Sequence, residues 1–280
     1  MRFYLIILMK HSQKPSKKFG EFAEMLYLCG TEQYNQRKRN TMDQNDYLEF
    51  SEDGKTVIGC RNDYEGTVVI PDGVTEIKAN AFVGCRGITS IVIPDSVTEI
   101  GNHVFYSCTG LASIKIPAKV AEIGRRAFFG CTSLTSIVIP DSVTKIGERA
   151  FEGCRSLISI EIPDSVTVIG DGAFSGCTSL TSIKIPNSVT KIGERILEGC
   201  TSLTSIEILD SMTEIGELAF DDSKGLITME IPDGVTEIDL SASLRGLDLS
   251  KITLYVPIGT GYAYRHHPFF SQFKEVKIEK

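Results

Sequence analysis

Tryptophan is absent from this chain of 280 residues, histidine occurs only four times, and basic residues do not outnumber acidic ones. The net charge is -7, and this mild acidity argues against a nucleic-acid-binding protein, which usually carries a basic face. The apolar run at residues 3–9 is far shorter than the roughly 20 residues that a membrane-spanning helix needs. We therefore expect neither a nucleic-acid partner nor an integral membrane span.

The sequence also lacks the motifs of common chemical sites. No C-x₂-C spacing suits a zinc ion, and no G-x-S-x-G motif presents a nucleophile. Gly259 and Gly261 form only a fragment of a dinucleotide fingerprint, which we interpret as a turn. His266 and His267 are adjacent and do not share a face, and His103 has no partner in the sequence. These absences favour a non-enzymatic protein without a cofactor or metal.

Residues 1–46 are expected to be an N-terminal leader and a flexible linker. The apolar run 3–9 lies at the lower limit for a signal peptide, and Lys10 and His11 follow it instead of a small-residue cleavage site. Export remains one interpretation; a loosely attached leader, or a start codon placed too far upstream, is the other. Residues 30–46 are polar without an apolar period, as is typical of a flexible segment.

What the chain does contain is a repeat of 23 residues, and such a period predicts a solenoid with one coil per unit. One unit reads IPDSVTKIGERAFEGCRSLISIE. Prolines, cysteines and phenylalanines each recur at this spacing, with Leu209, Ser223 and Leu197 as the respective departures. The cysteines in register are Cys85, Cys108, Cys131, Cys154, Cys177 and Cys200.

Each unit contains a short strand. The alternation in LISIEI points Leu157, Ile160 and Ile162 inward, and Pro163 ends the strand because proline cannot donate to the ladder. The predicted fold class is therefore a repeat solenoid with short parallel strands, mostly β and irregular with little helix.

The rest of the unit completes the coil. Val143 and Ile146 are expected to point inward from a second extended piece, and Ala150 and Phe151 to fill the core. Gly147 is expected to supply a backbone angle that other residues avoid.

The cysteines in register are expected to form a buried ladder of free thiols. Their side chains would stack in parallel instead of pointing toward each other, which disfavours disulfides, and cysteine packs as a small core residue. Cys29 and Cys60 lie outside the register and are expected to be more reactive.

The unit IPDSVTKIGERAFEGCRSLISIEIP resembles the BspA-like leucine-rich repeats, over residues 47–280. The segment 47–70 is similar to the N-terminal cap of such arrays, with Asp53-Gly54 as a hairpin turn, and 251–280 is similar to their C-terminal cap. The resemblance implies a right-handed leucine-rich-repeat solenoid. It also implies a cell-surface or secreted, adhesin-like protein whose partner is an extracellular-matrix, host or neighbouring-cell protein; an intracellular interaction scaffold is the alternative.

One candidate binding surface is the outward position between the two strand isoleucines. The residue there varies while the scaffold repeats, and mixed charges follow one another along the sheet. The alternative is a solubilised sheet whose adjacent opposite charges gain little. The charged candidates are Lys115, Glu161, Lys184 and Glu207.

A second candidate surface is the column of residues that directly follow the core phenylalanine in each unit. If this column faces outward, Tyr106 and Phe129 form an exposed aromatic pair beside Arg125 and Arg126, a combination typical of binding hot spots. Two alternatives remain: the pair packs into an irregular side of the coil, or residues 19–28, whose apolar spacing suits a short helix, cover it.

Overall fold

The computed structural model describes residues 47–207, 211–230, 240–256, 258 and 261–278. The chain divides into two compact units, Met1–Tyr47 and Leu48–Lys280. The expected leader and linker, with Cys29 and residues 19–28, lie outside the described residues. Everything below concerns the second unit.

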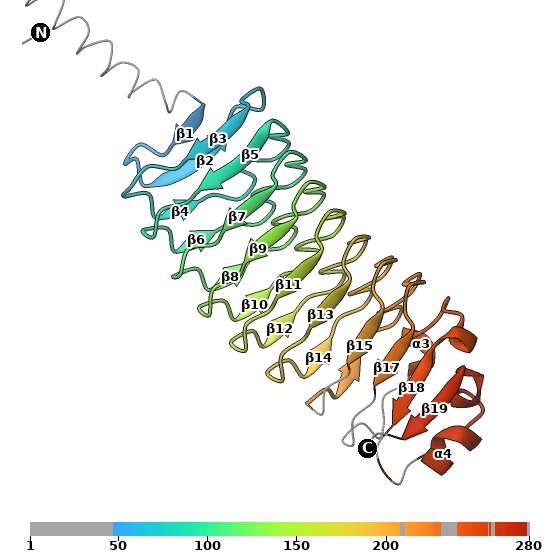
Figure 1. Cartoon of the computed structure of the whole chain (residues 1–280). Helices are drawn as coiled ribbons and strands as arrows, with labels where there is room; N and C mark the ends of the chain where they lie inside the picture. Colours follow the sequence, from blue (N-terminus) through green and yellow to red (C-terminus); the bar gives the residue numbers. More distant parts are fainter. Residues whose placement is uncertain (1–46, 208–210, 231–239, 257, 259–260, 279–280) are drawn as a thin grey trace, which may run out of the picture. The chain divides into compact units, whose positions relative to one another are not determined.

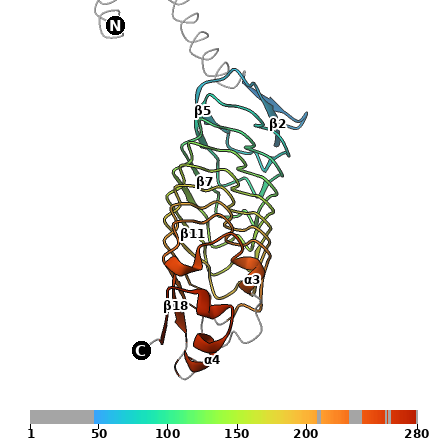
Figure 2. The same cartoon turned by 90° about the vertical axis from the view of Figure 1, so that its right-hand side faces the viewer.

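This unit is a β-solenoid of about 9 turns, with parallel strands and little helix, as the 23-residue period predicts (Figures 1 and 2). Most coils contribute a longer strand to one row and a two-residue strand to another. We call the row of longer strands the front ladder. It comprises β3 (Gly66–Val69), β5 (Ile88–Val92), β7 (Ser113–Lys115), β9 (Ser136–Val138), β11 (Ser159–Glu161), β13 (Ser182–Lys184), β15 (Ser205–Glu207), β17 (Thr228–Glu230), β18 (Thr253–Val256) and β19 (Glu275–Ile278).

The second row, the back ladder, holds the other extended piece of each coil. Its pairs are parallel and, after the first, place each residue beside the one 23 positions later, as for Ile146 and Ile169. It comprises β2 (Thr56–Cys60), β4 (Glu76–Ile77), β6 (Glu99–Ile100), β8 (Glu122–Ile123), β10 (Lys145–Ile146), β12 (Val168–Ile169), β14 (Lys191–Ile192) and β16 (Glu214–Ile215).

Atypical elements close the two ends of the coil stack. At the start, β1 (Leu48–Phe50) pairs antiparallel with β2, and Gly54 has a φ of 68° in the turn between them, so the expected hairpin is confirmed. The later elements are α3 (Leu240–Ser243), η2 (Leu249–Lys251), α4 (Gly261–His266) and η3 (Phe270–Gln272). Because α4 begins at Gly261, the interpretation of this glycine and the residues after it as a turn was wrong.

The core between the ladders is a column of stacked phenylalanines. The rings of Phe128 and Phe151 are 5.3 Å apart with an interplanar angle of 3°, and those of Phe151 and Phe174 are 5.5 Å apart at 1°. All three side chains are buried, as are Leu157 and Ile160. Each coil therefore buries its apolar side against the next, which a single coil cannot do.

Beside the rings, the thiols form the expected buried ladder, and the described cysteines are free. From Cys108 to Cys200, each thiol donates a hydrogen bond to the phenylalanine carbonyl of the preceding coil, as Cys154 does to Phe128 over 3.2 Å. Ser223, the departure from the cysteine column, makes the same bond to Leu197 over 2.7 Å. The column thus requires a small donor that satisfies a buried carbonyl.

The expectation that Gly147 supplies an unusual backbone angle was wrong, because Gly147 is not among the residues with positive φ. A Cβ at this position would lie 2.7 Å from the backbone nitrogen of Arg125 in the preceding coil. Gly147 is therefore required by the close approach of two coils. Positive φ occurs instead at Gly153, where φ is 74°.

Candidate functional site

The front ladder presents one column of outward side chains. Val92 and Val138 are 53% and 61% exposed, and the four charged candidates Lys115, Glu161, Lys184 and Glu207 are exposed as well. The backbone alternation turns these residues outward and the isoleucine before each of them toward the core. The column therefore combines isolated apolar side chains with charges of both signs.

The front ladder is interrupted at two places, and a hollow lies at each. Among the described residues, the strand pairing of this ladder stops between β9 and β11 and again between β13 and β15. A hollow of about 420 Å³ lies across the first interruption, where Val138, Glu161, Lys184 and the turn at Pro163 line it. A second, of about 310 Å³, lies across the other and includes Glu207 among its lining residues.

The charges at the first hollow do not neutralise each other. Glu161 and Lys184 are register partners on β11 and β13, yet within the described part of the chain neither forms an ion pair. On the back ladder, by contrast, Lys145 Nζ lies 2.7 Å from Glu122 Oε1. The back charges thus pair with each other, whereas Glu161 and Lys184 on the front ladder do not. For the front column, both the binding surface and the solubilised sheet stay predictions.

The second candidate surface is the flank of the coil stack. We define the flank as the outward side chains between each back-ladder strand and the buried cysteine of the same coil. Here Tyr106 and Phe129 stack with ring centroids 4.7 Å apart and an interplanar angle of 3°. Both rings are half-buried, so the structure forms the expected pair but leaves it less exposed than the sequence suggested.

Two arginines adjoin this aromatic pair, as expected. The guanidinium of Arg126 lies 5.9 Å from the centre of the Phe129 ring. Its Nε is buried and has no hydrogen-bond partner among the described residues. Arg125 instead contacts Glu148 of the next coil over 3.2 Å. Partial burial, followed by the charges of Arg126 and Arg125, lowers the pKa of His103, which lies beside Tyr106.

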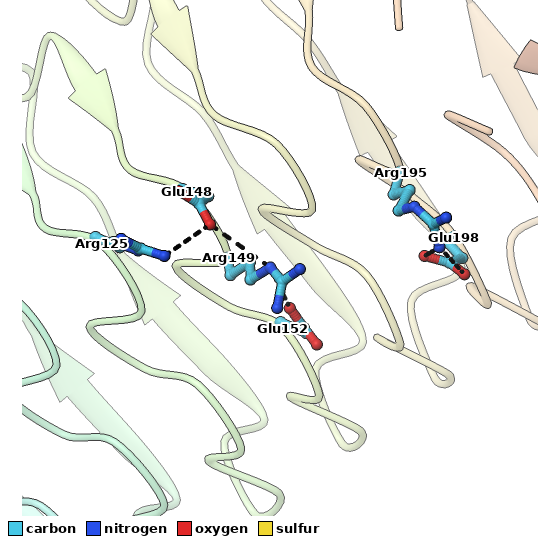
Figure 3. Close-up of polar contacts among 6 residues, drawn as sticks. All are labelled: Arg125, Glu148, Arg149, Glu152, Arg195 and Glu198. Atoms are coloured by element: carbon cyan, nitrogen blue, oxygen red, sulfur yellow. Dashed lines mark hydrogen bonds and ion pairs between the residues drawn. The ribbon is translucent and has the colours of Figure 1, made fainter. Parts of the chain in front are cut away.

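The sequence did not reveal the backbone conformation of this flank. Arg126, Arg149 and Arg195 all have positive φ, between 51° and 55°, a conformation that costs a non-glycine residue about 1–2 kcal/mol. Arg149 contacts Glu152 and Glu148, and Arg195 contacts Glu198, as Figure 3 shows. No local sequence motif marks these arginines as residues with positive φ, although the sequence shows that they recur at the 23-residue period.

Other chemistry is not apparent in the described part of the chain. No group of His, Cys, Asp and Glu there could hold a metal ion, and no helix there is long and apolar enough to cross a membrane. A hydrogen bond with the Cys85 thiol, together with burial, raises the pKa of Cys60. Cys60 is partly exposed, unlike the buried thiols of the column, and its higher reactivity stays a prediction.

Comparison with known proteins settles the family. The model of the BspA type leucine rich repeat region matches residues 62–163 and 144–260, with six copies. This chain belongs to that family. Its members are typically non-catalytic, and leucine-rich repeats of this kind suggest a protein-interaction module. No curated protein matches the chain.

Solved structures of bacterial leucine-rich-repeat proteins have the same fold. One from Bacteroides ovatus ATCC 8483 is 27% identical, with a TM-score of 0.58 over 83% of this chain and 74% of that one. The T. pallidum leucine-rich-repeat protein is 34% identical, with a TM-score of 0.57 over 64% of this chain and 86% of its own. One from Eubacterium ventriosum ATCC 27560, 22% identical with a TM-score of 0.59 over 68% and 49%, shows the fold alone.

Proposed function

We propose that this chain is a non-catalytic protein-binding module whose binding surface is the front face around the 420 Å³ hollow. The observation that carries the proposal is the unpaired state of Glu161 and Lys184 on neighbouring strands beside that hollow. Opposite charges that do not satisfy each other, next to the exposed Val138, form a surface to which an external partner can add contacts.

The extent of the column favours a protein over a small molecule. From Lys115 to Glu207 the outward charges cross five coils, a distance of roughly 19 Å at about 4.8 Å per coil. A small ligand would occupy one hollow and leave most of this column unused. A partner protein that presents charges in the opposite order could contact the column along its length.

We further propose that the module acts as an adhesin-like protein at the cell surface or after secretion, with an extracellular-matrix, host or neighbouring-cell protein as its partner. Family resemblance supports this location. Charge complementarity at the front face would set the orientation and association rate of the complex more than its affinity.

The test uses the immobilised full chain to capture proteins from a matrix extract and, separately, from a cytosolic extract. The front variant exchanges the charges of Glu161 and Lys184, and the matched back variant exchanges those of Glu122 and Lys145. Net charge is the same in all three proteins. We expect one matrix protein to bind the native chain and the back variant, and to be lost from the front variant.

Other outcomes of this experiment contradict parts of the proposal. Equal capture by the front variant would remove the binding site from the front face, and loss only in a Tyr106→Ala, Phe129→Ala variant would place it on the flank. Capture from cytosol alone would favour the intracellular scaffold. Failure of the native chain to capture a protein from either extract would contradict the proposed function.

A further inference from the structure

The flank changes the sign of its charge along the coil stack. The first three coils, which we call the basic half, carry Arg125 and Arg126 but no carboxylate, whereas the next four, the acidic half, carry seven carboxylates and two arginines. The change of sign falls between Arg126 and Glu148. The basic half consists of the outward residues of 79–83, 102–106 and 125–129, and the acidic half of those of 148–152, 171–175, 194–198 and 217–221.

Contacts within the chain leave some charged side chains without an ion pair. These are positive in the basic half and negative in the acidic half. The ion pairs in Figure 3 use Arg125, Arg149 and Arg195. Arg126 in the basic half takes part in no ion pair within the described residues, and neither do the exposed Glu194 and Glu217 in the acidic half. One continuous surface thus carries an arginine on one side of the sign change, and carboxylates on the other, that form no ion pair within the described residues.

We propose that the flank binds a second copy of this chain in an antiparallel, two-fold arrangement, with the basic half of each copy against the acidic half of the other. A surface whose two halves complement each other is self-complementary, as a two-fold interface requires. Both complementary contacts then form at once and the assembly closes as a dimer. This interaction goes beyond the proposed binding by the front face and does not depend on it.

The position of the sign change fixes the register of the two copies. With the two-fold axis between the Arg126 and Glu148 coils, Tyr106 of one copy lies opposite the coil of Gly172 and Ser175 in the other. Gly172 occupies the position at which the neighbouring coils carry arginines, and it is itself buried, since a Cβ there would lie 3.3 Å from Arg149 Cγ. The coil that faces Tyr106 therefore carries the carboxylate of Asp171 without a cation of its own.

The same arrangement accounts for the aromatic pair and for Arg126. Tyr106 and Phe129 are half-buried within one chain, and the opposed copy would cover their remaining surface. The guanidinium of Arg126, which lies over Phe129 without a carboxylate partner, would face Glu148 and Glu152 of the other copy. Aromatic and arginine side chains are the residue types most enriched at such contacts.

Sedimentation equilibrium of the full chain tests the proposal through a charge-exchange cycle. One variant carries Arg125→Glu and Arg126→Glu, so the two coils beside the two-fold axis, 125–129 and 148–152, are both acidic; the other carries Glu148→Lys and Glu152→Lys, so these two coils are both basic. We expect a dimer of the native chain whose dissociation constant rises about tenfold or more between about 0.05 M and about 0.5 M salt. Each variant alone should be monomeric, and an equimolar mixture of the two should again form a dimer.

The matched control exchanges the charges of Lys191 and Glu214 on the back ladder and should leave the native dimer unchanged. Thermal unfolding of each variant verifies that it folds, and Arg126→Gln, a milder change, should weaken the dimer without abolishing it. A monomeric native chain at low salt would overturn the proposal. So would a dimer insensitive to the flank variants, or a mixture of the two charge variants that stays monomeric.

Discussion

Glu161 and Lys184 lie side by side on β11 and β13 without forming an ion pair, although the equivalent neighbours Glu122 and Lys145 on the back ladder approach to 2.7 Å. Both pairs are separated by one coil and both are exposed. What differs is the hollow of 420 Å³ that the front pair lines. Both pairs lie next to an interruption of their own ladder, which falls between β9 and β11 at the front and between β6 and β8 at the back.

Removal of either front charge should therefore leave the fold unaffected. We expect Glu161→Gln and Lys184→Gln each to change the free energy of unfolding by less than about 0.5 kcal/mol, as exposed substitutions without a specific contact do. Urea denaturation of the full chain measures this. A loss above about 1 kcal/mol for either variant would show that the charge has a structural role.

Phe151 should be among the most important residues for stability. It is fully buried and stacks on Phe128 and Phe174, so Phe151→Ala should cost roughly 3–5 kcal/mol through lost burial and the cavity left behind. Phe151→Leu is the matched control, because Leu197 shows that the column accommodates leucine. A loss near zero for the alanine variant, measured by urea denaturation, would mean that the ring column is not the core.

Gly147→Ala should destabilise the protein even though the backbone there is ordinary. The new methyl group would lie 2.7 Å from the Arg125 nitrogen and must push two coils apart, which typically costs about 1–3 kcal/mol. Lys78 occupies the same repeat position in the first coil and is exposed, so Lys78→Ala should have little effect. Equal melting temperatures for the two variants would contradict the close approach of the coils.

The thiol ladder should make stability fall at alkaline pH. Burial raises the pKa of Cys200 from its ordinary 9.0 to about 12, and that of Cys131 likewise to about 12. Between pH 9 and about pH 12 the unfolded chain releases thiol protons that the folded chain retains. The stabilising contribution is therefore complete below pH 9 and declines above it, by up to about 1.4 kcal/mol per pH unit for each thiol.

Thermal unfolding measured from pH 8 to about pH 12, in a reducing buffer, checks this decline. The control is Cys200→Ser. A serine hydroxyl can donate the same bond, as Ser223 does, so the variant should be nearly as stable at neutral pH and less sensitive to alkali. In a separate titration with Ellman's reagent, few thiols should react in the folded chain and all eight after denaturation. Stability independent of pH above 9 would contradict the buried free thiols.

Much of the fold could be predicted because a repeat multiplies every weak local signal. The alternation around Ile160 and the recurrence of Phe151 and Cys154 each predicted burial, which the structure confirms. The role of Gly147 could not be predicted, since it depends on the distance between two coils and not on its own conformation. For the same reason the sequence identified the thiol column but not the carbonyls that those thiols satisfy.

The candidate sites show where sequence reasoning stops. It placed Lys115, Glu161, Lys184 and Glu207 on one outward column, because strand alternation fixes the direction of each side chain. It could not reveal which neighbouring charges pair, or where the front ladder is interrupted, because these depend on side-chain reach and small displacements between coils. Their role in binding stays a prediction.

The most direct test of the front face is site-specific cross-linking to the captured partner. A photo-crosslinking amino acid would be placed at position 184 of the full chain on the front ladder or, as the matched control, at position 145 on the back ladder. We expect a covalent adduct with the partner from position 184 and none from position 145. An adduct from position 145 alone, or equal adducts from both, would contradict binding by the front face.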